Sequence, residues 1–426
     1  MSEPRRSQTQ FVIIGTIALA VACILQAAAT PDREEEVQRF VRLSEEAQPA
    51  VAALTGLPPG EPVKVNMMTR KEMGEFLRTT VRIEYPNDDL YKFSLCLAEI
   101  GLVPPGYDLT KGLVDLIAEQ AGAVYDPHAK TLNGLVDLPR SMKSLPVQKY
   151  IIAHELCHAL QDREIDIVAQ SEVALKNNDY SYALRSVIEG MASLVMLAYS
   201  QNLSLEQVPD VRTIMRANFS RNERNPGMKA LASSPRYLRE SLIGPYAEGG
   251  AFAQAWLEAN SGLSLGAMLV KMPVSSEQVL HFEKYVEGDL PTPIDLSAAA
   301  ALMPSEWKLF YANTLGEFDL RVLFEIYQVT EAHATDIASG WDGLKFEAYT
   351  DPDSEMVLLG SSVWDTEEDA VEFDNGFAMV LAAIRDSSEF RLVQHGTRVN
   401  FVVCRIDENT REGILGVLGE AEGNRE

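Results

Sequence analysis

The chain has 426 residues, and 37 Lys and Arg against 62 Asp and Glu give a formal net charge of −25. This balance argues against nucleic acid or an anionic membrane surface as the main partner, because both are bound through an excess of basic side chains. Hydrophobic residues make up 46% of the chain, so most of it is expected to fold. The length suggests two or three domains, and four cysteines are too few for a disulfide-stapled fold.

The N-terminus has the layout of a secretory signal peptide. Arg5 and Arg6 precede an apolar stretch of 15 residues, 11–25, and small residues follow at 27–29. The stretch is shorter than the ~20 residues of a spanning helix, although extension to Ala29 leaves an uncleaved anchor as an alternative, and a buried soluble helix as another. We therefore predict that residues 1–29 are a signal peptide or N-terminal anchor. The protein is then extracytoplasmic: secreted, periplasmic, or membrane-anchored and facing outside.

Beyond this segment, helical and strand-like patterns alternate along the chain. The first part predicts helices at 32–53, 70–80, 91–100 and 109–121, a strand at 63–68, and a β-hairpin from apolar runs at 122–125 and 131–138. The second part predicts helices at 147–162, 180–199, 235–242 and 247–260, with a linker at 289–293. The last part predicts helices at 315–338 and 367–384, strands at 344–349 and 356–364, and a hairpin from 391–394 and 398–404.

This order predicts an α+β fold, with a small sheet or hairpin, a largely helical region and a C-terminal α+β domain. We assign residues 30–145 to an N-terminal α+β region that carries the hairpin. Residues 146–290 form the helical region, and residues 295–426 form a C-terminal domain of unknown role.

The most informative segment is an H-E-x-x-H motif, His154 to His158, within a stretch of helical apolar spacing. The two histidines lie one turn apart on one helix face, so their imidazoles could bind one Zn²⁺ from the same side. Glu155 beside them could reach a zinc-bound water. The apolar flanks indicate a buried helix, where such side chains need a partner; a pair of surface histidines is the alternative. Cys157 faces away from the metal side and is expected to pack in the core.

A zinc hydrolase needs a third protein ligand and an open fourth position. Glu189 is the candidate, because it is the polar residue on an otherwise apolar helix, 31 residues after His158. An unpaired carboxylate would be costly to bury there, and metal ligation would remove that cost. A buried salt bridge is the alternative.

The motif and its downstream glutamate resemble the gluzincin metallopeptidases, the group to which thermolysin belongs. The chain is more closely similar to a set of uncharacterised exported prokaryotic proteins with zinc-peptidase motifs, from about residue 122 through most of the remaining sequence. The resemblance rests on H-E-L-x-H-A-L-Q-D at 154–162, E-G-x-A at 189–192, P-Y-x-x-G at 245–249, S-x-E-Q-x-L-H-x-E-K-Y at 275–285 and W-D-T-x-x-D-A-x-E-F at 364–373.

This resemblance implies one Zn²⁺ per chain, bound by His154, His158 and Glu189. Glu155 would be the general base that takes a proton from the metal-bound water and then donates it to the leaving amine.

The resemblance also implies supporting residues. Asp162 and Ser193, each one turn after a ligand, would hold a ligand's imidazole N–H. Tyr246 would donate to the developing oxyanion, with His281 and Tyr285 as reserves, although a buried aromatic or a helix cap would also explain each of them. One strand of the predicted hairpin would pair with extended substrate, unless the hairpin is only structural.

The sequence therefore predicts an exported zinc metallopeptidase acting on a peptide or protein substrate. One alternative is a catalytically inactive zinc-binding scaffold or binding protein, and another is a zinc hydrolase acting on a non-peptide amide or ester. The intact Glu155 favours an enzyme over the scaffold. The oligomeric state does not follow from the sequence.

Overall fold

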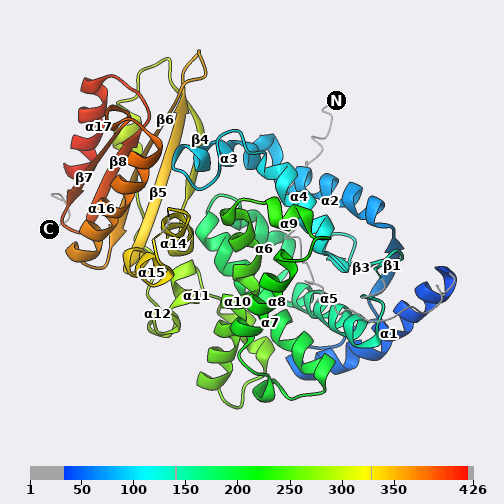
Figure 1. Ribbon diagram of the computed structural model, residues 1–426. Coiled ribbons are helices and arrows are strands. Elements are labelled where there is room, and N and C mark those ends of the chain that lie inside the picture. Colours follow the sequence, from blue (N-terminus) through cyan, green and yellow to red (C-terminus); the bar gives the residue numbers. More distant parts are fainter. Residues whose placement is uncertain (1–32, 140–141, 328, 421–426) are drawn as a thin grey trace, which may run out of the picture.

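Helices predominate in the computed structural model, which describes residues 33–139, 142–327 and 329–420, and the strands form two separate sheets (Figure 1). The predicted α+β class is confirmed. No helix within these described ranges is long and apolar enough to cross a membrane. The predicted signal peptide or anchor, residues 1–29, lies outside the described residues.

The smaller sheet contains the predicted hairpin. Its strands β1 (Lys64–Met68), β2 (Ala123–Asp126) and β3 (Thr131–Leu135) lie in the order β1-β3-β2, with β3 parallel to β1 and antiparallel to β2. Asp126 closes the turn of the hairpin, because its carboxylate accepts hydrogen bonds from the backbone N–H groups of His128 and Ala129. Of the two hairpin strands, β3 is central and β2 lies at an edge of the sheet, so β2 is the one that could pair with an extended substrate.

The helical part of the molecule surrounds α5, which is buried on almost every side. This helix packs against α1, α7 and β2, as its apolar composition all round requires. The helices of this part are α1 (Arg33–Thr55), α2 (Arg70–Glu84), α3 (Asp89–Glu99), α4 (Leu109–Gln120), α5 (Leu145–Ile165), α6 (Ile167–Ala174), α7 (Asn178–Gln201), α8 (Val211–Glu223), α9 (Lys229–Ser233), α10 (Arg236–Ala259), α11 (Ser276–Leu280) and α12 (Phe282–Glu287).

Helix α10 runs without a break from Arg236 to Ala259, so the prediction of two helices, 235–242 and 247–260, was wrong. The prediction broke the helix near Pro245, which has no N–H to donate to the carbonyl of Ser241 one turn earlier. The guanidinium of Arg185, on α7, donates to that carbonyl instead. A side chain from a neighbouring helix thus satisfies the group that the proline leaves free.

The larger sheet forms the core of the C-terminal part and is antiparallel throughout. Its order is β4-β5-β6-β8-β7. Its strands are β4 (Lys308–Thr314), β5 (Trp341–Thr350), β6 (Met356–Trp364), β7 (Phe390–His395) and β8 (Arg398–Val403). The helices of this part are α13 (Ser297–Ala300), α14 (Glu317–Ile326), α15 (Glu331–Ala338), α16 (Glu367–Ile384) and α17 (Glu408–Glu420).

Both faces of this sheet are covered. Phe346 of β5 and Leu358 of β6 belong to the main core with Phe373 of α16, while Tyr349 and Val357 belong to a second cluster that includes residues of α13 and α17. Residues 315–338 form two helices instead of the one predicted, because Thr330 caps a new helix by accepting from the backbone N–H of His333. One strand, β4, and several helices were not predicted: α6, α8, α9, α11, α12, α13 and α17.

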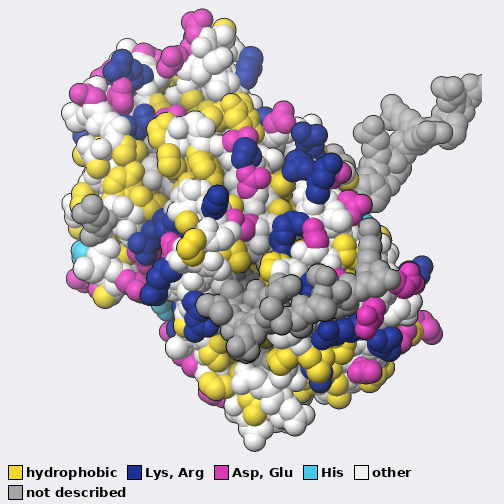
Figure 2. Space-filling view, turned by 45° about the vertical axis from the view of Figure 1, so that its right-hand side comes forward, with side chains coloured by type: hydrophobic (Ala, Val, Ile, Leu, Met, Phe, Trp, Pro, Cys, Tyr) yellow, Lys and Arg dark blue, Asp and Glu magenta, His cyan; other side chains and the backbone are white. Residues whose placement is uncertain are grey.

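The surface reflects the acidic composition without separating the charges. Figure 2 shows Lys and Arg side chains interspersed with Asp and Glu on the face that it presents. The three cysteines among the described residues, Cys96, Cys157 and Cys404, are free and buried.

Candidate metal centre

Helices α5 and α7 bring the three predicted metal ligands together. His154 and His158 project from successive turns of α5, and Glu189 faces them from α7. The two histidine Nε2 atoms are 2.9 Å apart, and Glu189 Oε2 lies 3.1 Å from the Nε2 of His154 and 3.5 Å from that of His158. These three residues therefore form a group that could hold a metal ion.

The spacing of the three donor atoms fits a tetrahedral metal site. Donors bound to one zinc at about 2.0–2.1 Å lie about 3.3 Å from one another, close to the three observed separations. One shared proton could bridge only one of the three contacts. A single cation at their centre would satisfy all three.

Gln161 fixes the proton position on His158. Its amide nitrogen donates to the carbonyl of Ile188 at 3.0 Å, so its oxygen faces His158 Nδ1, 2.9 Å away. The Nδ1 atom must then carry the proton, and Nε2 presents its lone pair to the other two donors. Sequence reasoning missed Gln161, although its place three residues after His158 puts it on the same helix face.

The surroundings also set the charge of the donors. Burial, together with the neighbouring His158, lowers the pKa of His154 to about 4. Burial alone would raise the pKa of Glu189, but the two histidines outweigh it and lower that pKa to about 2. At neutral pH His154 is therefore neutral and Glu189 is a carboxylate, the forms that bind zinc.

Glu155 lies next to the ligands and is fixed by the small sheet. Its Oε2 accepts a hydrogen bond of 2.6 Å from the backbone N–H of Tyr125, on β2. The edge strand thus lies directly beside the predicted general base. Tyr125 had no predicted role, and nothing in the sequence indicated this contact.

Tyr246 also reaches the group, through a close crossing of α7 and α10. Its ring stacks on the His154 ring, with centroids 5.6 Å apart and an angle of 9° between the planes. Gly190 and Gly249 make this possible: a Cβ atom on Gly190 would lie 2.1 Å from the backbone of Gly249, so only glycines allow the two backbones to approach so closely. The E-G-x-A and P-Y-x-x-G motifs meet at this crossing.

The structure contradicts the predicted role of Asp162. His158 Nδ1 pairs with Gln161, whereas Asp162 Oδ2 accepts hydrogen bonds from the Tyr125 hydroxyl at 2.8 Å and from Lys130 Nζ at 2.7 Å. Asp162 therefore ties the β2–β3 hairpin to α5 and contacts no metal ligand through these bonds.

The predicted support from Ser193 is also absent. Its hydroxyl is buried and makes no hydrogen bond with any described residue. The two reserves lie elsewhere: His281 pairs with Glu317 at 2.8 Å, and the Tyr285 hydroxyl donates to the carbonyl of Lys271.

A second group of potential ligands contains Glu277, Asp289 and Asp365. Its centre is occupied by Lys284, whose Nζ lies 3.2, 2.8 and 2.6 Å from their carboxylates. The chain itself therefore supplies the cation at this second group.

The three residues of the first group, together with Glu155 and Tyr246, are almost fully buried. His154, Glu155 and His158 are 0% exposed, Tyr246 is 1% exposed and Glu189 is 2% exposed. A low-dielectric surrounding of this kind strengthens the binding of a cation to a carboxylate.

Comparison with known proteins adds two similarities. Residues 308–413, from β4 into α17, match a family described as a domain of unknown function, DUF8575. No curated protein matches the chain. A crystal structure from Chloroflexus aurantiacus, described as that of "a putative hydrolase with a novel fold", is 15% identical over 61% of this chain and 92% of that chain, with a TM-score of 0.36.

Proposed function

We propose that the protein is a zinc-dependent metallopeptidase of the gluzincin type. The observation that carries this proposal is the convergence of His154, His158 and Glu189 through donor atoms 2.9 to 3.5 Å apart, with Glu155 alongside. Two imidazoles and one carboxylate are the ligand set of thermolysin-like zinc sites. Export of the enzyme stays a prediction from the N-terminal sequence.

The residues around the group would have separate roles in hydrolysis. Bound zinc supplies a Lewis acid that lowers the pKa of a water ligand to about 7 and polarises the scissile carbonyl. Glu155 would accept the proton of that water and pass it to the leaving amine, held in place by the N–H of Tyr125. Tyr246, stacked on His154, is our candidate donor to the oxyanion. Gln161 would keep the Nε2 of His158 unprotonated.

The edge position of β2 supports a peptide as the substrate. An extended chain can add to a sheet edge through backbone hydrogen bonds, and β2 is the edge strand that contacts Glu155. A substrate carbonyl aligned with this strand would lie near the general base.

A second candidate function is a metal site that only stabilises the fold. The near-complete burial of the three ligands and the hydrogen bond already made by Glu155 favour it. The two functions differ in what Glu155 does, because a structural metal needs no general base.

The test compares wild-type protein with Glu155→Gln, both loaded with zinc, on casein, mixed peptides and simple esters. We expect wild type to hydrolyse peptides, and Glu155→Gln to keep one zinc per chain while losing at least about 10²-fold in rate. Hydrolysis of esters alone would move the assignment to a non-peptide hydrolase. If zinc-loaded wild type hydrolyses none of these substrates, the proposed hydrolase function is replaced by that of a metal site that only stabilises the fold.

A further inference from the structure

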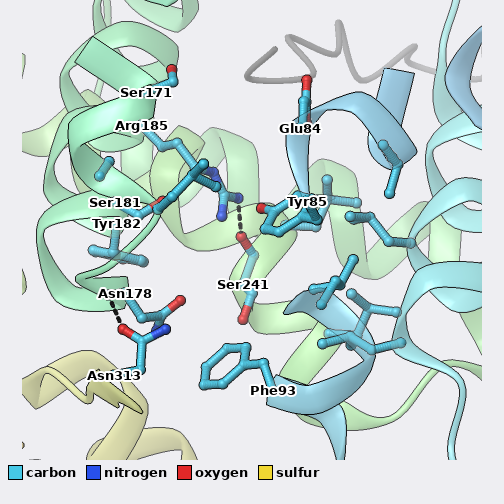
Figure 3. Close-up of a pocket in the computed structure, with 18 of the residues that line it drawn as sticks. Glu84, Tyr85, Phe93, Ser171, Asn178, Ser181, Tyr182, Arg185, Ser241 and Asn313 are labelled. Carbon is cyan, nitrogen blue, oxygen red and sulfur yellow. Dashed lines mark hydrogen bonds between the residues drawn. The ribbon is translucent and has the colours of Figure 1, made fainter. Parts of the chain in front are cut away.

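A cavity of about 140 Å³ lies between two sets of helices. Its lining includes residues of α7 and α10 that come one helical turn before the residues of the metal group in the sequence. Helices α2, α3 and α4 form one wall, and α6, α7 and α10 form the other, with β4 at one end (Figure 3). An engineered cavity of about 150 Å³ holds benzene. The cavity therefore has room for an apolar group of about that size.

The two walls differ in chemistry. The wall from α2, α3 and α4 is mainly aliphatic, with Leu77, Val81, Leu90, Leu109, Leu113 and Ile117, and it also carries Thr80, Glu84, Tyr85 and Phe93. The opposite wall carries hydrogen-bonding groups, with Asn178, Ser181 and Arg185 on α7 and Ser241 on α10 (Figure 3). A ligand for this cavity needs an apolar body and a polar end.

Arg185 sets the charge of that polar end. Among the described residues that line the cavity it is the one with a positive charge. Its described hydrogen bond goes to the Ser241 carbonyl, and it forms no ion pair with a described carboxylate. Its guanidinium extends between α7 and Tyr85 in Figure 3. A guanidinium has five N–H donors, so donors remain for a ligand after the bond to Ser241.

The two carboxylates of the lining form no described ion pair with Arg185, although burial raises the pKa of Asp319 and the positive charge of Arg185 is one of the causes that lower it. Asp319 accepts hydrogen bonds from Asn178 and from the Tyr237 hydroxyl. Glu84 points away from the cavity in Figure 3.

We propose that this cavity binds a carboxylate that carries an apolar group of about phenyl size, with Arg185 as the partner of the carboxylate. Two sources share this chemistry: the C-terminal residue of a peptide, and a free fatty or aryl acid. On α7, Arg185 lies four residues before Glu189, and on α10, Leu242 lies four residues before Tyr246. One helical turn therefore separates the cavity from the metal group along each helix. The assignment to a substrate C-terminus rests on the proposed function, whereas the binding of the carboxylate does not.

The test uses titration calorimetry with 3-phenylpropionate and its uncharged match, 3-phenylpropionamide. Because Arg185 also satisfies the carbonyl freed by Pro245, the variants are built on Pro245→Ala, which restores the hydrogen bond within α10. We expect Pro245→Ala to bind the acid at least about tenfold more tightly than the amide, and Pro245→Ala/Arg185→Gln to lose this preference at an unchanged Tm. Equal binding of acid and amide by Pro245→Ala, or a preference that survives Arg185→Gln, would overturn the proposal.

A second arm separates the cavity from the metal. Chelator-treated wild type and Glu189→Gln should keep the preference for the acid, and its loss would mean that the carboxylate binds the metal instead of Arg185. Titration with N-acetyl-phenylalanine and octanoate then distinguishes the two sources. Tighter binding of N-acetyl-phenylalanine supports a peptide C-terminus, whereas tighter binding of octanoate would overturn that assignment without touching the hydrolysis assigned to Glu155.

Discussion

Two groups of ligand-type side chains lie in the described part of this molecule, and they differ in what balances their negative charge. Around Glu277, Asp289 and Asp365 the cation is Lys284. Between His154, His158 and Glu189 no described side chain supplies a cation, and the three donor atoms face one another directly. Converging acidic groups therefore indicate a metal only where the chain has no cation of its own to place among them.

The two groups also hold different parts of the molecule. Lys284 joins α12 to Asp365, at the end of β6, and so connects the helical part to the larger sheet. The first group joins α5 to α7 inside the helical part. Loss of the Lys284 charge should therefore weaken the contact between the helical part and the larger sheet. Loss of a metal from the first group should weaken the packing of α5 against α7.

The largest expected effect comes from Glu189→Gln. Removal of the one anionic donor should abolish zinc binding, and with it the stabilisation that bound metal gives to the folded state. Addition of zinc should raise the Tm of metal-free wild type and leave that of Glu189→Gln unchanged. An equal rise in both proteins, measured by calorimetry, would show that Glu189 is no ligand.

Lys284→Met tests the second group, in which a lysine supplies the cation. It leaves Glu277, which is 1% exposed, beside two further carboxylates without their cation. We expect the free energy of unfolding to fall by about 3 kcal/mol, with zinc content unchanged. Lys284→Arg is the control and should cost less than about 1 kcal/mol. Urea unfolding measures both, and a Lys284→Met protein as stable as wild type would contradict this account.

Gln161 and Asp162 offer a matched pair on consecutive positions of α5. Gln161→Leu removes the acceptor of His158 Nδ1 and should weaken zinc affinity by about 10- to 100-fold. Asp162→Asn should leave the affinity within about threefold of wild type, because its partners are Tyr125 and Lys130. Competition with a coloured chelator measures the affinities, and the opposite order would restore Asp162 as the support of the metal ligands.

The smallest effect concerns buried carboxylates that have neither a metal nor a lysine. Burial raises the pKa of Asp179 to about 7 and that of Asp319 to about 6. The folded state therefore keeps protons that the unfolded chain loses above about pH 4, so stability from this source should be greatest below about pH 4 and should fall as pH rises towards 7.

We expect a loss of about 1–2 kcal/mol between pH 6 and pH 8 from these groups, measured by urea unfolding at both values. Asp179→Asn should reduce this loss, since an amide keeps the oxygen that accepts from the backbone N–H of Ser276 and does not ionise. A pH dependence of the same size in the variant would assign the effect to other groups.

Much of the candidate centre could be predicted from the sequence, because helix geometry fixes what lies four residues apart. That rule placed His154 and His158 on one face, and the cost of burying Glu189 indicated its need for a partner. The choice between Gln161 and Asp162 could not be made in this way. Both lie on the correct side of α5, and the carbonyl of Ile188, on another helix, decides which one faces His158.

One error in the fold has the same origin in a long-range contact. Pro245 is tolerated within α10 because Arg185 approaches from α7. Strand β4 pairs with β5, for example Asn313 with Phe346. Its Phe310, Tyr311 and Thr314 are residue types that favour strands, so its omission was an error of local prediction. Local patterns were sufficient for the β2–β3 hairpin, whose strands are joined by one short turn.

The most direct test of the account is a zinc-edge anomalous difference map from crystals of the zinc-loaded protein. We expect one strong peak per chain, about 2.0–2.2 Å from the Nε2 atoms of His154 and His158 and from Glu189 Oε2, and no peak beside Lys284. A map without a peak at the three donors, or with its peak among Glu277, Asp289 and Asp365, would contradict the assignment of the metal centre.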